Sequence, residues 1–358
     1  MNNLKSLYIH IPFCISKCKY CDFFSIPCNH GNVPDDYINA LCNEIKFRLE
    51  YFGIKELDTI YIGGGTPSLL AYNQLYKIFE IIKKCTNIKA DCEITIESNP
   101  DDITERLIEN WKNIGINRIS LGIQSFSNMA LEYVSRRANA DVNENALKII
   151  NNVWHGDLSA DLICGLPCES KASFKKDLEC LLKYKPDHIS MYSLTIEEET
   201  PLGKELANGK LQYDFDFADD LWISAKNYLT ANGYNHYEVS NFSLPGKECR
   251  HNLKYWNHQG YVGCGSGGAG SVYFDNGEGF RWTNINNIDR YIKFWNSADS
   301  NNASNIEDFP DYIQISENIS LETSIFEFFM MGLRKLGGIN ENDFVNTFHM
   351  PMPEKIKK

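Results

Sequence analysis

The chain has 358 residues, a length that allows one large α/β domain with an appendage or two ordinary domains. Hydrophobic residues make up 43% of the chain and charged residues 23%, a composition that excludes disordered and collagen-like proteins. The formal net charge of -12 disfavours sequence-independent binding of DNA or RNA, because an acidic surface repels a phosphate backbone.

The cysteines and the lack of long apolar stretches indicate the compartment. No run approaches the roughly 20 apolar residues that span a bilayer, and residues 1–6 lack the apolar core of a signal peptide. Twelve cysteines are too few for a disulfide scaffold in a chain of this length. We therefore expect a cytoplasmic protein without a transmembrane segment, in which clustered cysteines bind metal or carry out chemistry.

Short runs rich in Ile, Leu, Val and Tyr alternate with helical periodicity through the first two-thirds of the chain. We predict six strands, at Ser6–Ile11, Thr59–Ile62, Glu93–Glu97, Arg118–Ile123, Ser159–Ile163 and His188–Leu194. Between them, apolar residues recur at three- and four-residue spacing, as in Tyr37, Leu41, Ile45 and Leu49. Such α/β units in series predict a parallel sheet, and we favour a partial (β/α)6 barrel over a doubly wound sheet.

The pattern changes after the last of these units and divides the chain into three predicted segments. Residues 1–235 contain the strand–helix units, and residues 236–285 contain two polar–aromatic motifs and the glycine-dense run Gly263–Gly270. Residues 286–358 form a small, mainly α-helical appendage. Its clearest helical stripe consists of Leu321, Ile325, Phe328, Phe329 and Leu333.

Three cysteines follow directly after the first predicted strand, at Cys14, Cys18 and Cys21. Thiolates suit soft centres such as zinc or iron–sulfur clusters, and a short loop can present three of them from one side. A structural zinc would need a fourth protein ligand, and three packed free thiols are the remaining alternative. We favour a [4Fe–4S] cluster whose fourth iron stays open for the amino and carboxylate groups of S-adenosylmethionine (SAM), an established radical cofactor.

With this loop after its first strand, the sequence resembles the radical SAM enzymes. The resemblance implies that the cluster passes an electron to SAM and produces a 5′-deoxyadenosyl radical. It also implies that Tyr8 contacts SAM, because the porphyrin branch of the family has a tyrosine at this distance before the first cysteine. Tyr20 precedes Cys21 directly, at the place where an aromatic ring packs near the adenine.

The second predicted strand runs into Gly63-Gly-Gly-Thr-Pro67. Glycines let the backbone approach a ligand, but the run lacks the GK[ST] ending of a phosphate loop and the GxGxxG pattern of a dinucleotide site. Taken alone it is a turn. Beside the cysteine triad it resembles the radical SAM element that holds the methionyl amino group, which implies that Gly64, Gly65 and Thr66 contact SAM.

Polar residues also stand at the ends of the later strands. These are Glu97, Gln124 and Asp161, with Arg136 following Gln124 in the next segment. Because the carboxyl ends of parallel strands converge on one mouth, the two acids can accept from ribose hydroxyls or the ammonium, and Arg136 can pair with the SAM carboxylate. Each residue alone would be a cap or a surface residue. Together, in this order, they match the SAM-contact positions of the oxygen-independent coproporphyrinogen III oxidase family.

Two later segments resemble another branch, the haem chaperone family. They are His236-Tyr-Glu-Val-Ser-Asn-Phe242 and Arg250-His-Asn-Leu-Lys-Tyr-Trp256, and Phe23 stands where the oxidase usually has a further cysteine. The resemblance implies that the His-Asn-x-x-Tyr-Trp segment contacts haem. His251 is then the leading axial-ligand candidate, since imidazole is a common haem ligand, with His236 and Cys249 behind it. A packed histidine in an aromatic corner is the alternative.

The aromatic pair Tyr255 and Trp256 offers flat apolar surface for a porphyrin face. Two features depart from the haem chaperone pattern. Ala269 stands where relatives often have a histidine, which puts any iron ligand from the glycine run in doubt. The chain also ends at Lys358, which predicts a shortened appendage.

The resemblance implies a haem-trafficking function rather than an assigned reaction. The protein would bind haem or a porphyrin, pass haem to an acceptor protein and receive electrons from a small donor, and no catalytic residue is assigned. The alternative function is the oxidative decarboxylation of coproporphyrinogen III propionates to vinyl groups. Radical SAM modification of RNA and a zinc-stabilised binding module are further alternatives, disfavoured by the net charge and by the cysteine spacing.

Overall fold

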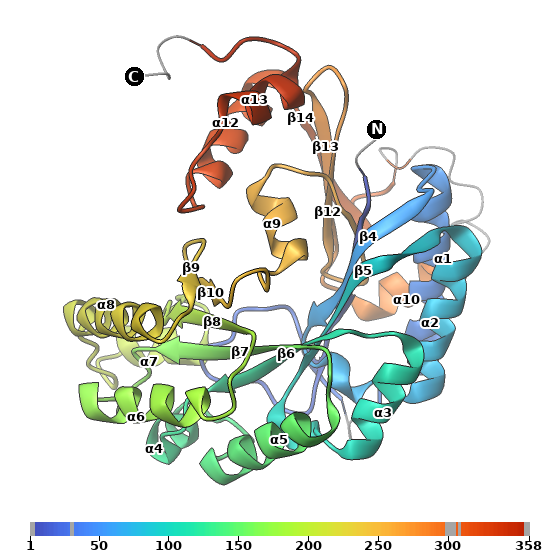
Figure 1. The fold of residues 1–358 in the computed structure, drawn as a ribbon. Helices are drawn as coiled ribbons and strands as arrows, with labels where there is room; N and C mark the ends of the chain where they lie inside the picture. The colour runs from blue at the N-terminus through green and yellow to red at the C-terminus, as the bar shows by residue number, and fades with distance from the viewer. Residues whose placement is uncertain (1–3, 29–31, 298–305, 307–308, 354–358) are drawn as a thin grey trace.

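Parallel strands in chain order form the centre of the computed structural model, which describes residues 4–28, 32–297, 306 and 309–353 (Figure 1). They are β1 (Ser6–Ile11), β4 (Glu56–Gly64), β5 (Asn87–Ser98), β6 (Arg118–Gln124), β7 (Asp157–Cys164) and β8 (His188–Ser193). β11 (Val262–Cys264) lies parallel beside β1, while β10 (Asn241–Ser243) pairs antiparallel with β8 and with β9 (Asn235–His236). The sheet curves into an open arc whose edges are β11 and β9, and the predicted strands and partial-barrel fold are confirmed.

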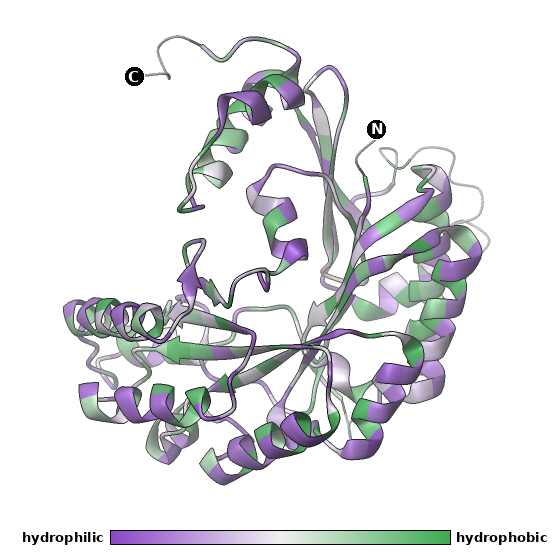
Figure 2. Ribbon diagram, viewed as in Figure 1, coloured by the Kyte–Doolittle hydropathy of each residue, from purple (hydrophilic) through white to green (hydrophobic). Residues whose placement is uncertain are grey.

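Helices connect consecutive strands and cover the outer face of the arc (Figure 1). They are α1 (Asp35–Tyr51), α2 (Tyr72–Cys85), α3 (Glu105–Ile114), α4 (Asn128–Tyr133), α5 (Ala140–Val153), α6 (Lys171–Leu182), α7 (Pro201–Ala207) and α8 (Phe215–Ala231). Polar caps begin many of them, as where Thr104 accepts from the Leu107 N–H at the start of α3. The longer helices, such as α3 and α5, show both green apolar and purple polar stretches in Figure 2. The buried side of α1 contains the predicted stripe, Tyr37, Leu41, Ile45 and Leu49.

The strands have one apolar and one polar face. In β4, Ile60 and Ile62 belong to the main core between the sheet and the helices, whereas Thr59 and Tyr61 point to the concave face. The parallel register continues the polar row from strand to strand, placing Glu97 beside Ser120, Ser120 beside Ser159, and Asp161 beside Ser190. The concave side of the arc is therefore a polar interior.

The remaining chain forms a second, three-stranded antiparallel sheet and several helices. The strands are β12 (Ala269–Tyr273), β13 (Gly279–Asn284) and β14 (Gln314–Ile319). The helices are α9 (Arg250–Trp256), inside the arc, α10 (Ile288–Trp295), α12 (Leu321–Gly332) and α13 (Glu341–Phe348) (Figure 1). The helix predicted near residues 321–333 is α12, in which Leu333 is the C-cap. None of the described helices is long and apolar enough to cross a bilayer.

A fully buried ion pair joins the two sheets. Arg48 Nε donates to Glu44 Oε1 at 2.6 Å, and both side chains, one turn apart on α1, are inaccessible to solvent. The same carboxylate accepts from Asn284 Nδ2 at 2.8 Å, from the Gly265 N–H at 2.7 Å and from the Tyr291 hydroxyl at 2.5 Å. All four lone-pair positions of Glu44 are thereby used, which fixes the C-terminal sheet against α1.

We predict that Arg48→Ala lowers the free energy of unfolding by about 3–5 kcal/mol, because it leaves a buried carboxylate without its cation. The midpoint of urea unfolding, followed by circular dichroism, measures this loss. The matched control is Lys148→Ala, which removes an exposed partner of Glu144 and should cost less than about 0.5 kcal/mol. Equal shifts in the two variants would contradict the prediction.

Candidate functional site

The cysteine loop closes on itself through backbone pairing. β2 (Phe13–Cys14) runs parallel to β3 (Ile26–Pro27), and the Cys28 N–H donates to the Cys14 carbonyl at 2.8 Å. Within the loop, the Cys21 N–H donates to the Cys18 carbonyl at 3.2 Å. Cys14, Cys18 and Cys21 are all partly exposed residues, so one short segment at the surface contains the three thiols.

Donors from two other loops reach these sulfurs. The Thr66 hydroxyl donates to Cys14 Sγ at 3.4 Å, and Arg136 Nη1 donates to Cys18 Sγ at 3.6 Å. Burial raises the pKa of the Cys21 thiol, and the nearby thiolate charges of Cys18 and Cys14 add to this effect. Hydrogen bonds and positive charge at sulfur stabilise thiolates, which are the form that binds metal.

The glycine-rich turn after β4 lies between the cysteine loop and β5. Gly64 has a φ of 114°, and a Cβ at this position would lie 2.6 Å from the His10 ring, so only glycine fits. The Gly64 N–H donates to Glu97 Oε2 at 2.9 Å. The Thr66 hydroxyl, besides donating to the cysteine sulfur, accepts from Asn99 Nδ2 at 3.2 Å. The turn therefore contacts both the loop and the end of β5.

Asn99 connects this turn to Arg136. Arg136 Nη2 donates to Asn99 Oδ1 at 2.9 Å and to the Gly122 carbonyl at 2.5 Å. Gln124 has a φ of 67°, a value uncommon for a non-glycine residue, and a Cβ on Gly122 would meet both its amide and the Arg136 guanidinium. The sequence analysis missed Asn99, because an asparagine before a proline is an ordinary turn signal.

Two carboxyl groups lie near each other on the concave face. Glu97 accepts from the Tyr61 hydroxyl and the Gly64 N–H, each at 2.9 Å, and Asp161 accepts from the Ser120 hydroxyl at 3.0 Å. Burial raises the pKa of Glu97 to about 7, and the charge of Asp161 adds to the rise. Burial also raises the pKa of Asp161. Such a pair favours a ligand that brings a cation and hydroxyl donors.

The predicted tyrosines lie beside these groups. The Tyr8 ring stacks on Tyr61 with the centroids 6.2 Å apart, and burial raises the pKa of Tyr8 well above its usual value, with the charge of Glu97 adding to the rise. Burial likewise raises the pKa of Tyr20, which lies close to Cys18. Tyr61 is a further residue that the sequence analysis missed. The alternation of polar and apolar residues along β4 is the signal that could have identified it.

The structure thus brings the predicted SAM contacts together around the carboxyl ends of β1 and β4–β7. They are Tyr8, Tyr20, Gly64, Gly65, Thr66, Glu97, Gln124, Arg136 and Asp161. Among the described residues, no three His, Cys, Asp or Glu side chains converge as ligands of a single metal ion. In an iron–sulfur cubane each thiolate binds a different iron, so the three cysteine sulfurs do not need to meet at one point.

His251, the predicted haem contact, is buried on α9. Its Nδ1 hydrogen-bonds with the Thr59 hydroxyl at 2.8 Å, and its Nε2 hydrogen-bonds with the Tyr255 hydroxyl at 2.8 Å. Burial lowers the pKa of His251 to about 3, so the ring is neutral at pH 7. Its ring centroid lies 5.1 Å from that of Tyr61. Both ring nitrogens are therefore occupied, and the ring joins α9 to β4.

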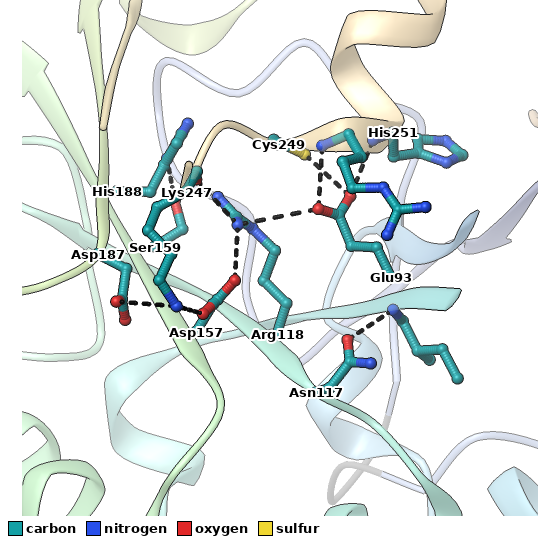
Figure 3. Close-up of polar contacts among 12 residues, drawn as sticks. Glu93, Asn117, Arg118, Asp157, Ser159, Asp187, His188, Lys247, Cys249 and His251 are labelled. Carbon is teal, nitrogen blue, oxygen red and sulfur yellow. Dashed lines mark hydrogen bonds and ion pairs between the residues drawn. The ribbon is translucent and has the colours of Figure 1, made fainter. Parts of the chain in front are cut away.

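Charged residues at the amino ends of β5–β7 hold the start of α9 (Figure 3). Glu93 accepts from the backbone N–H groups of Arg250 at 2.9 Å and His251 at 2.8 Å, as a carboxylate does at a helix N-terminus. Arg118 lies between Glu93 at 3.9 Å and Asp157 at 3.5 Å. Lys247 reaches Asp157 from the segment that leads into α9. This network fixes the His-Asn-x-x-Tyr-Trp segment inside the arc of the sheet (Figure 1 and Figure 3).

The two weaker haem candidates are also enclosed. His236 stacks on Phe242 with the ring centroids 4.5 Å apart, and its Nε2 hydrogen-bonds with the Val239 carbonyl at 3.3 Å. Cys249 is buried next to the start of α9, where its Sγ lies 3.6 Å from a Glu93 carboxylate oxygen. Neither side chain lines the cavities described next.

Two cavities separate α9 from the C-terminal elements. One, of about 400 Å³, lies between Tyr255 and Trp256 on α9 and Met330 and Met331 on α12. The other, of about 680 Å³, extends from Trp256 toward α13. His258 lines both cavities, and the sequence analysis did not consider it because it lies outside the recognised motif. The Tyr-Trp pair of the motif thus faces open space, while His251 lies behind it.

Comparison with known proteins identifies the family of this chain. Residues 8–181 match the family model of the Radical SAM superfamily. The chain is 34% identical to "Heme chaperone HemW" of Lactococcus lactis over 96% of its length and 85% of that protein. It is 33% identical to the Escherichia coli protein of the same name, over 95% of this chain and 85% of the other. This chain belongs to the HemW family of radical SAM proteins.

The fold of this HemW family member is shared with a solved enzyme. Coproporphyrinogen III oxidase (HemN) from Escherichia coli, described as a radical SAM enzyme, superposes with a TM-score of 0.79 at 20% identity, covering 97% of this chain and 79% of the other. Membership of the radical SAM superfamily implies a [4Fe–4S] cluster and SAM. The residues present fit both groups. Cys14 and Cys18 receive donors from Thr66 and Arg136, and among the described residues neither Glu97 nor Asp161 forms an ion pair with a lysine or arginine within 4 Å.

We predict that the parent protein loses stability as the pH rises and Glu97 ionises, and that Glu97→Gln abolishes this loss. Glu97 ionises near pH 4.5 in the unfolded chain and near pH 7 in the folded protein, so folding takes up a proton between these values. The free energy of unfolding of the parent therefore falls as the pH rises through this window, and the glutamine variant lacks this contribution. Urea unfolding midpoints at pH 5 and pH 8, measured without SAM, test it. Glu105→Gln, on the exposed side of α3, is the control, and parallel pH profiles for parent and Glu97→Gln would contradict the assignment.

Proposed function

We propose that this protein is a haem chaperone that binds haem and transfers it to an acceptor protein. The observation that carries this proposal is the identity of 30–36% to proteins named heme chaperone HemW over most of the chain. The cavity beside Tyr255 and Trp256 supports it, because the motif that resembles a haem contact lines an open space. Electrons come from a small donor, and the protein acts in the cytoplasm.

The proposed division of labour follows the predicted segments. Residues 1–235 hold the [4Fe–4S] cluster through Cys14, Cys18 and Cys21 and bind SAM, residues 236–285 contact haem, and residues 286–358 cover it. When bound, the cluster supplies the electron that cleaves the sulfonium C–S bond. Of the chain's own residues, Arg136 pairs with the SAM carboxylate and Glu97 accepts from its ammonium.

A second candidate function is that of a coproporphyrinogen III oxidase, favoured by the likeness of the fold to that enzyme. The two functions differ in their product. With coproporphyrinogen III, SAM and a reductant under anaerobic conditions, we expect no vinyl product from this protein. Formation of the divinyl porphyrinogen would contradict the chaperone proposal and show that the protein is an oxidase.

We predict that replacing the three cysteines of the triad by alanine abolishes iron binding but preserves haem binding. Anaerobic reconstitution should load about four irons into the parent and none into the variant, since only the triad holds the cluster. Haem titration of the same samples should give dissociation constants within about twofold of each other. Cys85→Ala, a cysteine on α2 away from the loop, is the matched control. One zinc per chain in the parent, or iron retained in the triple variant, would overturn the cluster assignment.

We predict that His251→Ala weakens haem binding by at least about tenfold, because Tyr255 loses the hydrogen bond that orients it. Direct ligation of iron by His251 would require its Nε2 to leave the Tyr255 hydroxyl. Tyr255→Phe separates the two roles. If His251 orients Tyr255, both variants bind haem more weakly and keep the iron-ligand absorption bands. If His251 is the ligand, Tyr255→Phe frees Nε2 and binds at least as tightly as the parent, while His251→Ala alone changes the bands. If His251→Ala binds haem with the affinity of the parent, His251 has no role in the haem site.

A further inference from the structure

The cavity of about 400 Å³ between α9 and α12 has two different walls. One wall is aromatic, with Tyr255, Tyr261 and Tyr273, and the other consists of Met330 and Met331. We call this space the α9–α12 cleft. Flat aromatic surfaces and adaptable thioethers suit a planar apolar ligand, and the volume is in the range of small-molecule sites.

A cation stands at the rim of the α9–α12 cleft. The Arg334 guanidinium lies 5.5 Å from the centre of the Trp256 ring, and Arg334 is exposed just after the C-cap of α12. Arg281, the other arginine of the lining, is already held by both carboxylate oxygens of Glu327, at 2.7 and 2.8 Å. Within the described part of the chain, Arg334 forms no ion pair with a carboxylate. It is thus the lining residue that is ready to pair with a carboxylate of a ligand.

An imidazole completes the lining. His258 has a left-handed backbone with a φ of 53°, a strained conformation for a residue other than glycine, and its ring lies 3.9 Å from the Tyr273 ring. Its Nε2 hydrogen-bonds with the Ser324 hydroxyl on α12 at 2.9 Å. Histidines that bind metal commonly hold their second ring nitrogen by such a contact, which here leaves Nδ1 for the metal. His251, in contrast, uses both nitrogens for contacts with Thr59 and Tyr255.

A planar macrocycle with an iron centre and carboxylate side chains matches all three features. Building on the proposed haem function, we propose that haem binds in the α9–α12 cleft, where His258 ligates the iron and Arg334 pairs with a propionate. The Tyr-Trp pair of the motif then contacts the porphyrin face directly, and His251 acts one layer behind it by orienting Tyr255.

The test is titration of the purified full-length protein with haem, followed by its absorption bands, in the variants His258→Ala, Arg334→Gln and Met331→Trp. We expect His258→Ala to lose the imidazole-ligated bands and to bind at least about tenfold more weakly. Arg334→Gln should weaken binding of haem about threefold or more but leave binding of haem dimethyl ester unchanged, because the ester lacks the propionate charges. Met331→Trp, which adds bulk to the thioether wall of the cleft, should also exclude haem. Circular dichroism confirms that each variant is folded.

Two exposed residues give matched controls, His155→Ala and Arg106→Gln, which should bind haem like the parent. Parent-like affinity and bands in the folded Met331→Trp and His258→Ala variants would overturn the cleft assignment while the haem chaperone proposal stands. Loss of the imidazole bands in His251→Ala, with His258→Ala unchanged, would move the ligand to His251. A parent protein that binds no haem would instead overturn the proposed function itself. Because Met331→Trp does not replace His258 or Ser324, the test holds even if His258→Ala fails to fold.

Discussion

The two-faced character of the parallel strands is the constraint on which the rest of the structure depends. Isoleucines and leucines on one face hold the helices, so the other face is free to be polar. A polar concave face is costly unless its groups find partners, and most of them do so across neighbouring strands. The Ser120 hydroxyl donates to Asp161, the Tyr61 hydroxyl donates to Glu97, and the Ser159 hydroxyl hydrogen-bonds with His188. Despite these partners, burial raises the pKa of Asp161 and raises that of Glu97 to about 7, so this pair of acids favours a cationic ligand.

The same constraint explains how much of the structure could be predicted from the sequence. Local apolar runs define the six strands and their order, because each run lies between turns and amphipathic helices. The strand ends then identify Glu97, Asp161 and the glycine turn. Positions that depend on long-range folding were out of reach. Asn99 matters because it hydrogen-bonds with both Thr66 and Arg136, which are distant from it in the sequence, and no local pattern encodes these contacts.

The C-terminal third was harder to predict for a physical reason. Its short strands pair with distant partners, as when β11 extends the main sheet next to β1, so local periodicity carries little information. The motif around His251 identified the segment but not its environment. Whether the nitrogens of His251 are free to bind a ligand depends on their hydrogen bonds with Thr59 and Tyr255. These contacts depend on the tertiary structure. His258 can be recognised as a candidate ligand only from the fold, which places it beside α12.

A continuous set of contacts separates the carboxyl mouth from the α9–α12 cleft. The Tyr61 hydroxyl binds Glu97, the Tyr61 ring lies 5.1 Å from His251, and His251 holds Tyr255, which forms the cleft wall. A porphyrin in the cleft would therefore contact Tyr255 and Tyr261, which lie near Tyr8. It would meet Glu97 only through Tyr61 and His251. An oxidase needs the porphyrin propionates at the radical site, whereas a chaperone needs only a haem-binding site that the acceptor protein can reach. Since Arg334 at the cleft rim is exposed and the mouth is lined by enclosed acids, the arrangement favours carrying haem over oxidising its precursor.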